Sequence, residues 1–218
     1  MAVVEKYGRH PESGRTQFLL ELDSLDDWPE DVALARSKHF VLFLAMDAED
    51  VSDEEVAALA RKALDQGMVY VSAWGKGAER VHDVFEEASA DWDPDSDADT
   101  AILSEWHEEE PLSEALRFSV ASAVPASAYE KGCKATLAVT IGNPDWAESV
   151  REWLEDPAKL DKAAEDGDER IARDEDEEEE PAKAVEDEEL DLDDDDEEED
   201  EGDEDDGEDF GDDGGDDD

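Results

Sequence analysis

Apolar runs of strand length alternate with amphipathic segments between residues 17 and 157. The runs that predict strands followed by helices cover residues 39–46, 68–74, 100–106 and 134–141. Gln17 to Leu22 predicts one more strand, short and at an edge of the sheet. Four strand-to-helix units in a row are typical of a mostly parallel sheet with right-handed crossovers. We therefore expect an α/β fold, a three-layer sandwich in which helices cover both faces of the central sheet.

Two of the expected helices carry clear start signals. Ser52 and Glu55 have the spacing of a capping box, in which each side chain accepts a hydrogen bond from the other residue's backbone. Gly67 follows the last residue of that helical pattern and predicts its end. Asn143, followed by Pro144, predicts a helix start after the last strand. These positions support the alternating order of strands and helices.

The two ends of the chain differ from this middle region. Residues 1–16 are mixed and polar and are expected to be poorly ordered. Residues 158–218 form an acidic low-complexity tail, and 25 of the 33 residues from Glu186 to Asp218 are Asp or Glu. So many carboxylates repel one another and leave little apolar surface to bury, so we expect this tail to be disordered. The domain prediction is therefore an α/β domain over residues 17–157 between two polar ends.

The net charge of −54 limits the partners of the protein. Residues 1–160 contain 35 acidic and 14 basic residues, a balance of −21, so the folded region is acidic as well. Nucleic acids and anionic membranes need clustered basic residues, and we expect neither as a direct partner. Basic proteins and cations are the expected partners. Cys133 is the only cysteine and no secretory signal is evident, so we predict a cytoplasmic protein.

Polar residues follow several predicted strands, at the edge where parallel α/β sheets bind ligands. Asp47, Glu105 and Asn143 have such positions. The candidate catalytic residues are Asp47, Glu79, His82, Asp83 and His107. The candidate binding residues are Trp74, Gly75, Arg80 and Trp106. The competing interpretation is structural: Asp47 and Asn143 cap helices, Arg80 pairs with an acid, and the tryptophans fill the core.

Three other motifs give weaker signals. Gly75-Lys76-Gly77 lacks the third glycine of a dinucleotide fingerprint and the Gly-Lys-Ser/Thr of a phosphate loop, so it predicts a tight turn. The acidic loop 91–99 lacks the glycine and the final glutamate of a calcium loop. Cys133 lies between lysines, but a lone cysteine is usually only a thiol. We predict no metal site and no cofactor.

Part of the sequence resembles a small bacterial domain family of unknown function. The resemblance rests on Val69 to Gly75, on Glu79-Arg80-Val81-His82-Asp83-Val84-Phe85, and on Ser104-Glu105-Trp106-His107 with the helix that follows. It covers residues 38–142 and leaves the tail outside. The resemblance implies a compact α/β domain and nominates the polar residues of these motifs as a site, but it implies no activity.

Three hypotheses for function follow from the sequence. The first is a non-enzymatic interaction or regulatory protein whose acidic tail engages a basic protein surface or cations. The second is a small enzyme or ligand-binding domain with a polar site at the carboxyl edge of the sheet, and the sequence leaves open whether the protein is an enzyme. The third is a salt-adapted protein in which the acidic charge only maintains solvation.

Overall fold

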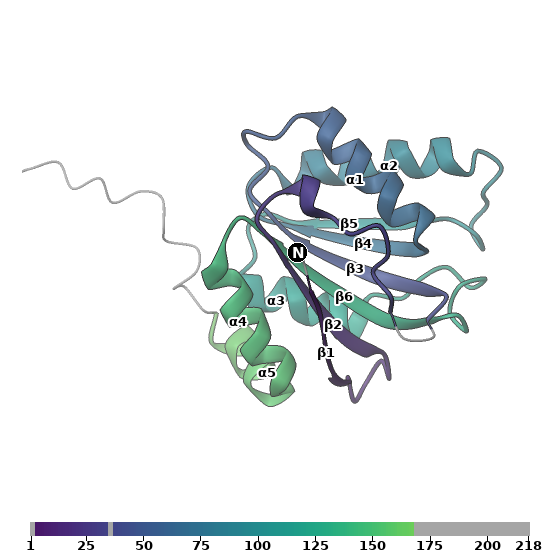
Figure 1. Cartoon of the computed structure of the whole chain (residues 1–218). Helices are drawn as coiled ribbons and strands as arrows, with labels where there is room; N and C mark the ends of the chain where they lie inside the picture. The colour runs from purple at the N-terminus through teal and green to yellow at the C-terminus, as the bar shows by residue number, and fades with distance from the viewer. Residues whose placement is uncertain (1–2, 35–36, 168–218) are drawn as a thin grey trace, which may run out of the picture. The chain divides into compact units, whose positions relative to one another are not determined.

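The computed structural model describes residues 3–34 and 37–167. Its centre is a six-stranded sheet with the strand order β1-β2-β6-β3-β4-β5 (Figure 1). The strands are β1 (Val4–Arg9), β2 (Thr16–Leu22), β3 (His39–Ala45), β4 (Met68–Trp74), β5 (Leu103–His107) and β6 (Cys133–Ile141). β2, β6, β3, β4 and β5 are parallel, and only β1 pairs antiparallel, with β2. This confirms the expected mixed α/β fold with a mostly parallel sheet.

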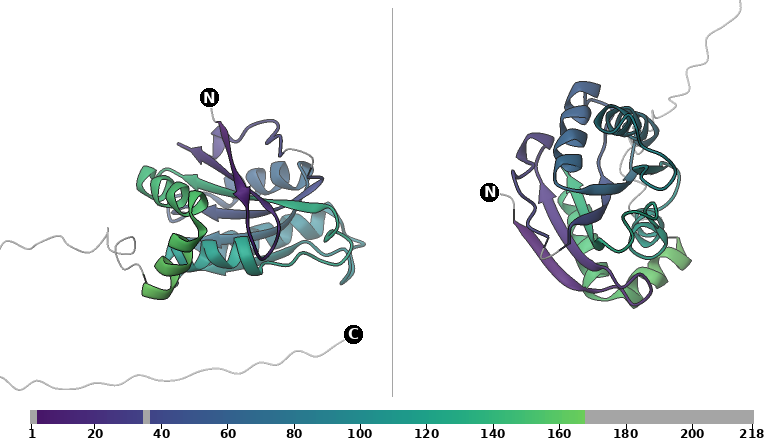
Figure 2. Two further views of the ribbon diagram at one scale, coloured as in Figure 1. Left: turned by 90° about the horizontal axis from the view of Figure 1, so that it is seen from below. Right: turned by 90° about the vertical axis from the view of Figure 1, so that its right-hand side faces the viewer.

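Helices lie on both sides of the sheet (Figures 1 and 2). They are α1 (Asp53–Asp65), α2 (Ala78–Trp92), α3 (Leu112–Arg117), α4 (Pro144–Glu155) and α5 (Pro157–Asp166), with short turns η1 (Leu25–Asp27) and η2 (Phe118–Ser122). α1 and α2 share a core with one face of the sheet, whereas α3, α4 and α5 pack against the other face. No helix within the described ranges is long and apolar enough to cross a membrane.

The local signals explain why the elements begin where they do. All seven residues of β4 are buried, and six of the seven in β3 are, as the continuous apolar runs predicted. The capping box at Ser52 and Glu55 is present at the start of α1. The Asn143 side chain accepts hydrogen bonds from the backbone N–H groups of Asp145 and Trp146 and caps α4. These three predictions are confirmed.

The structure corrects the description of residues 1–22. Val4–Arg9 of the segment expected to be poorly ordered forms β1, which pairs with β2 from Val4 opposite Leu20 to Arg9 opposite Thr16. The expected edge strand is therefore an interior strand between β1 and β6. No residue of β1 is fully buried: Val4, Glu5 and Tyr7 are half-buried and the other three residues are exposed, as suits an antiparallel edge strand. That pattern was too short to predict a strand.

The compact region extends beyond residue 157, where the predicted domain ended. α5 begins at Pro157, and Asp156 caps it by accepting a hydrogen bond from the backbone of Ala158. Leu160 and Ala164 of α5 are buried, and Leu160 belongs to the core that contains α3 and α4. The first part of the predicted tail is therefore part of the folded domain. The rest of the tail prediction, from residue 168 onward, lies outside the described residues.

Candidate functional site

The strand order creates a crevice beside β3 and β6. β3 leads into α1 on one side of the sheet, whereas the neighbouring strand β6 leads into α4 on the other side (Figure 1). In open α/β sheets, such a change of direction leaves space beyond the carboxyl ends of the strands. A groove of about 470 Å³ occupies this space. We call it the switch-point groove, and it is lined by Asp23, Ser24, Leu25, Asp26, Met46, Asp47, Val51, Glu55, Ile141, Gly142, Asn143 and Trp146.

The switch-point groove combines apolar walls with negative charge. Its apolar lining comes from Leu25, Met46, Val51, Ile141 and Trp146. Its charged lining consists of four exposed carboxylates, those of Asp23, Asp26, Asp47 and Glu55. None of the described residues that line it is basic. This chemistry suits a ligand with an apolar stem and a positively charged end.

Two of the polar residues in the groove also hold the local backbone. One Asp47 carboxylate oxygen accepts a hydrogen bond from the backbone N–H of Glu49 at 3.0 Å. The Ser52 hydroxyl and backbone N–H donate to the Glu55 carboxylate, which holds the pKa of Glu55 below its ordinary value. Glu55 is therefore negatively charged at neutral pH. Asp47 and Glu55 thus line the groove and also fix the turn into α1.

Trp74 and Gly75 pack against residues that line the switch-point groove. The Trp74 ring is buried and meets the Trp146 ring edge-on, with 5.1 Å between centroids, and its Nε1 donates to the Glu110 carbonyl at 2.7 Å. Gly75 has a φ of +115°, and a Cβ there would lie 2.2 Å from the Met46 carbonyl oxygen. Trp74 thus positions a wall of the groove, and Gly75 allows β4 to approach the segment that carries Met46 and Asp47.

Arg80 clamps the loop between β3 and α1. Its guanidinium contacts the Asp53 carboxylate and the Ala48 carbonyl, and it donates to the Val51 carbonyl at 2.9 Å. Val51 lines the switch-point groove, so Arg80 shapes the groove without lining it. Glu79, the preceding candidate, is exposed in the first turn of α2 and is not part of the groove lining.

The two candidate histidines lie on opposite faces of the sheet. Adjacent residues of a strand point to opposite faces, and β5 ends with Trp106 followed by His107. The Trp106 ring lies against His82 of α2, with 4.7 Å between centroids. The His107 ring lies against Phe118 of η2, and its Nδ1 is 3.1 Å from the Glu110 carboxylate. The structure therefore brings His82, Asp83 and Trp106 together but separates them from His107, Asp47 and Asn143.

Cys133 does not join either group. The thiol is buried at the start of β6, and burial raises its pKa above the ordinary value. A protonated, buried thiol is a poor nucleophile. The acidic loop after α2 starts and ends later than expected, because the helix continues to Trp92 and β5 begins only at Leu103.

Sequence reasoning missed part of the groove lining. Asp23 and Asp26 follow β2 and Glu55 lies in the first turn of α1, yet of the residues that line the groove only Asp47 and Asn143 were placed at this edge. The available signal was the position of Asp23 directly after a strand, the same signal that identified Asp47. It became informative only with β2 placed beside β6, because that pairing brings the loop after β2 to the same edge.

Comparison with known families identifies a domain family for this chain. The model for the domain of unknown function DUF7684 matches residues 18–157, more than half of the chain. The protein therefore belongs to this family, which confirms the expected membership of an uncharacterised domain family. No curated protein matches the sequence. The match includes most of β2 and all of α4, so the residues that line the switch-point groove lie within the family domain.

Proposed function

We propose that this protein is a non-enzymatic interaction protein that binds a basic protein surface. In this proposal the switch-point groove receives a lysine or arginine side chain of the partner. The acidic tail attracts the partner over a longer range, and its role rests on composition because it lies outside the described residues. The single observation that carries the proposal is the lining of the groove, with four carboxylates around apolar walls.

The size and chemistry of the switch-point groove support a cationic side chain as ligand. A lysine or arginine has an apolar stem of three or four methylene groups and a charged end. The stem can contact Leu25, Met46 and Trp146 while the charged end meets Asp23 or Asp47. Because these carboxylates are exposed, each ion pair is expected to contribute at most about 1 kcal/mol. Affinity must then come from several such contacts and from the tail.

The positions of the candidate catalytic residues favour binding over catalysis. Acid–base chemistry needs its groups within hydrogen-bond reach of one substrate, and His82 and His107 lie on opposite faces of the sheet.

The proposal also includes a cytoplasmic location, a three-layer arrangement of the domain and a disordered tail. The first of these rests on the single cysteine, and the last rests on the density of carboxylates.

Titration of the full chain with a lysine-rich peptide tests the role of the groove. We expect the peptide to bind, its acetylated counterpart not to bind, and affinity to fall as KCl is added. Asp23→Asn combined with Asp47→Asn should weaken binding severalfold, up to about thirtyfold, because two exposed ion pairs of at most about 1 kcal/mol each are lost. The asparagine at 47 keeps the oxygen that accepts from Glu49, so folding should be unchanged.

The matched control removes the same charge at the opposite edge of the sheet. Asp95→Asn combined with Glu130→Gln changes two exposed residues near the starts of β5 and β6. This variant should bind the peptide about as well as the unmodified chain. Equal losses for the two double variants would show that only net charge matters and would refute the role of the groove.

Removal of the tail tests the second part of the proposal. The chain should be cut after Gly167, because Leu160 and Ala164 are buried and an earlier cut would remove α5 from the core. We expect slower association and weaker salt dependence, while the effect of the Asp23/Asp47 variant persists. An unchanged association rate would exclude a role for the tail in attracting the peptide.

A further inference from the structure

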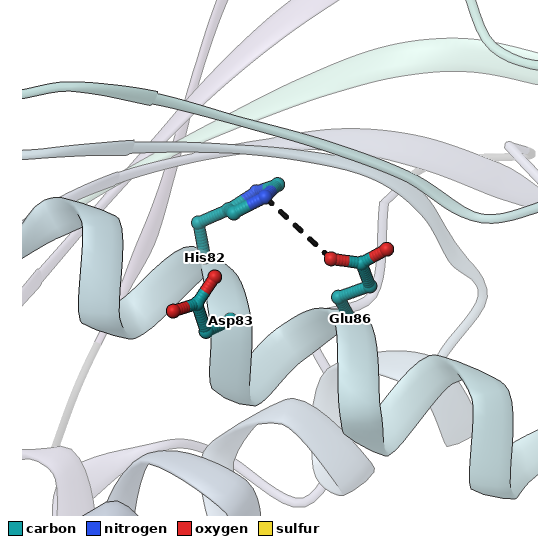
Figure 3. Close-up of side chains that lie close together, drawn as sticks. All are labelled: His82, Asp83 and Glu86. Atoms are coloured by element: carbon teal, nitrogen blue, oxygen red, sulfur yellow. Dashed lines mark ion pairs between the residues drawn. The ribbon is translucent and has the colours of Figure 1, made fainter.

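A second cluster of polar side chains lies on α2, away from the switch-point groove. His82, Asp83 and Glu86 place one imidazole nitrogen and two carboxylate oxygens within 4.8 Å of one another. His82 Nε2 is 3.7 Å from a Glu86 carboxylate oxygen. Figure 3 shows the His82 ring and the Glu86 carboxylate directed toward each other, with the Asp83 carboxylate beside them. The spacing follows from the helix, because residues four apart lie one turn above each other.

The His82 ring is held in a fixed position before any ligand arrives. Its ring lies 4.7 Å from the Trp106 ring, and only 13% of its side chain is exposed. Its Nδ1 is buried and has no hydrogen-bond partner among the described residues. Nε2, the nitrogen that faces Glu86, is therefore the one through which His82 can accept a ligand. A nitrogen fixed beside two exposed carboxylates loses little conformational entropy when it binds an ion.

We propose that His82, Asp83 and Glu86 form a binding site for a divalent first-row transition-metal ion such as Zn²⁺ or Ni²⁺. One imidazole and two carboxylates are suitable ligands for these ions, with water in the remaining positions. Ca²⁺ and Mg²⁺ prefer ligand sets made of oxygen alone and should compete weakly. Within the part of the chain that the structure describes, His82 Nδ1 has no acceptor that would orient the ring further, so we expect moderate affinity. This site is independent of the proposed binding of basic proteins.

Trp106 provides a local signal for metal binding. Trp106 is 45% exposed and its ring contacts His82. In contrast, Trp74 and Trp146 contact each other, and Trp92 lines a different groove. A paramagnetic ion such as Ni²⁺ bound at His82 should quench the fluorescence of this indole. Trp106→Phe should remove most of that quenching, while the heat of metal binding stays unchanged. This result would show that Trp106 reports on the metal site without being part of it.

The experiment titrates the full chain with Ni²⁺ and, in parallel, with Zn²⁺ by calorimetry. Excess Mg²⁺ is present throughout to occupy the weak oxygen sites of the acidic tail. We expect one saturable site per chain and partial quenching by Ni²⁺. His82→Gln should weaken binding by at least about tenfold, because loss even of an outer partner of a metal ligand costs that much. Circular dichroism verifies that the variant is folded.

Two double variants on α2 separate a metal site from general attraction by carboxylates. Asp83→Asn with Glu86→Gln should weaken binding about as much as His82→Gln. Glu87→Gln with Asp91→Asn removes the same charge from the same helix and should leave binding unchanged, since both residues line a different groove. Equal losses in both pairs, or full affinity in His82→Gln, would overturn the proposal and assign the binding to carboxylates in general.

Discussion

The two ends of the parallel strands differ in whether their charged side chains are buried or exposed. At the edge where β2 and β6 begin, Arg15 is buried, with 6% of its surface exposed. Its guanidinium donates to the carbonyls of Ala123 at 2.5 Å, Ser119 at 2.9 Å and Val120 at 3.2 Å. At the edge where these strands end, four carboxylates of the switch-point groove are exposed to solvent.

This difference shows which charges serve the fold and which remain available to a ligand. The carbonyls that Arg15 contacts are at the end of the helical segment formed by α3 and η2, where backbone acceptors lack helical partners. A positive charge there also interacts favourably with the helix dipole. The carboxylates at the opposite edge are exposed, and even Asp47 and Glu55, which fix the turn into α1, can contact a partner without unfolding the domain.

The largest expected effect is at the edge where β2 and β6 begin, where Arg15 is buried. Arg15→Met should lower the free energy of unfolding by about 3 kcal/mol, because three buried carbonyls lose the charged donor that Arg15 provides. Unfolding in urea, followed by circular dichroism, measures the change. Arg61→Met, at an exposed position of α1, is the control and should change stability by less than about 0.5 kcal/mol. A similar loss in both variants would contradict the structural role of Arg15.

The next effect concerns the support of the groove. Gly75→Ala should destabilise the domain by about 2 kcal/mol or more, because residue 75 has a positive φ and the new Cβ would meet the Met46 carbonyl. Since Met46 lines the switch-point groove, affinity for the lysine-rich peptide should fall as well. Gly8→Ala is the matched control, because a Cβ at Gly8 meets nothing within 4 Å. If thermal unfolding gives equal midpoints for the two variants, the close approach at Gly75 is not the cause.

The smallest effect is a pH dependence of stability at the edge where Arg15 is buried. Burial lowers the pKa of His10 below its ordinary value, with Arg15 adding to this and Glu12 and Asp161 opposing it. Because the folded-state pKa lies below the unfolded-state pKa of about 6.5, the unfolded state takes up the proton first. The contribution of neutral His10 is therefore complete above about pH 6.5 and is lost as pH falls through the lower, folded-state pKa.

Comparison of His10→Gln with the unmodified chain isolates this contribution. Unfolding midpoints should decrease less in the variant than in the unmodified chain between neutral and mildly acidic pH. Part of the decrease should remain, since burial and Lys38 also lower the pKa of His39. Glu5, whose pKa is lowered mainly by Arg151, acts only at more acidic pH and does not interfere. Parallel curves for the two proteins would exclude His10.

Local sequence patterns were sufficient for much of the fold. The continuous apolar runs of β3 and β4 predicted strands buried on both faces, and the residues at 52, 55 and 143 predicted helix starts. These signals act over a few neighbouring residues, so no knowledge of distant contacts was needed. Adjacent side chains of a strand point to opposite faces of the sheet, so the order Trp106-His107 already implies that these two side chains are separated. That rule places these two side chains on opposite faces of the sheet without any knowledge of the helices.

The position of β2 beside β6 depends on contacts that no local pattern contains. Thr16 pairs with Ala135, and the pairing of β1 with β2 likewise depends on the packing of the whole sheet. Several strand orders satisfy the same apolar pattern, and they differ in which faces the assembled chain can bury together. The strand order brings Asp23 and Asp47 to one groove and leaves His82 on another surface. Residue types thus set the available chemistry, while long-range packing selects which groups act together.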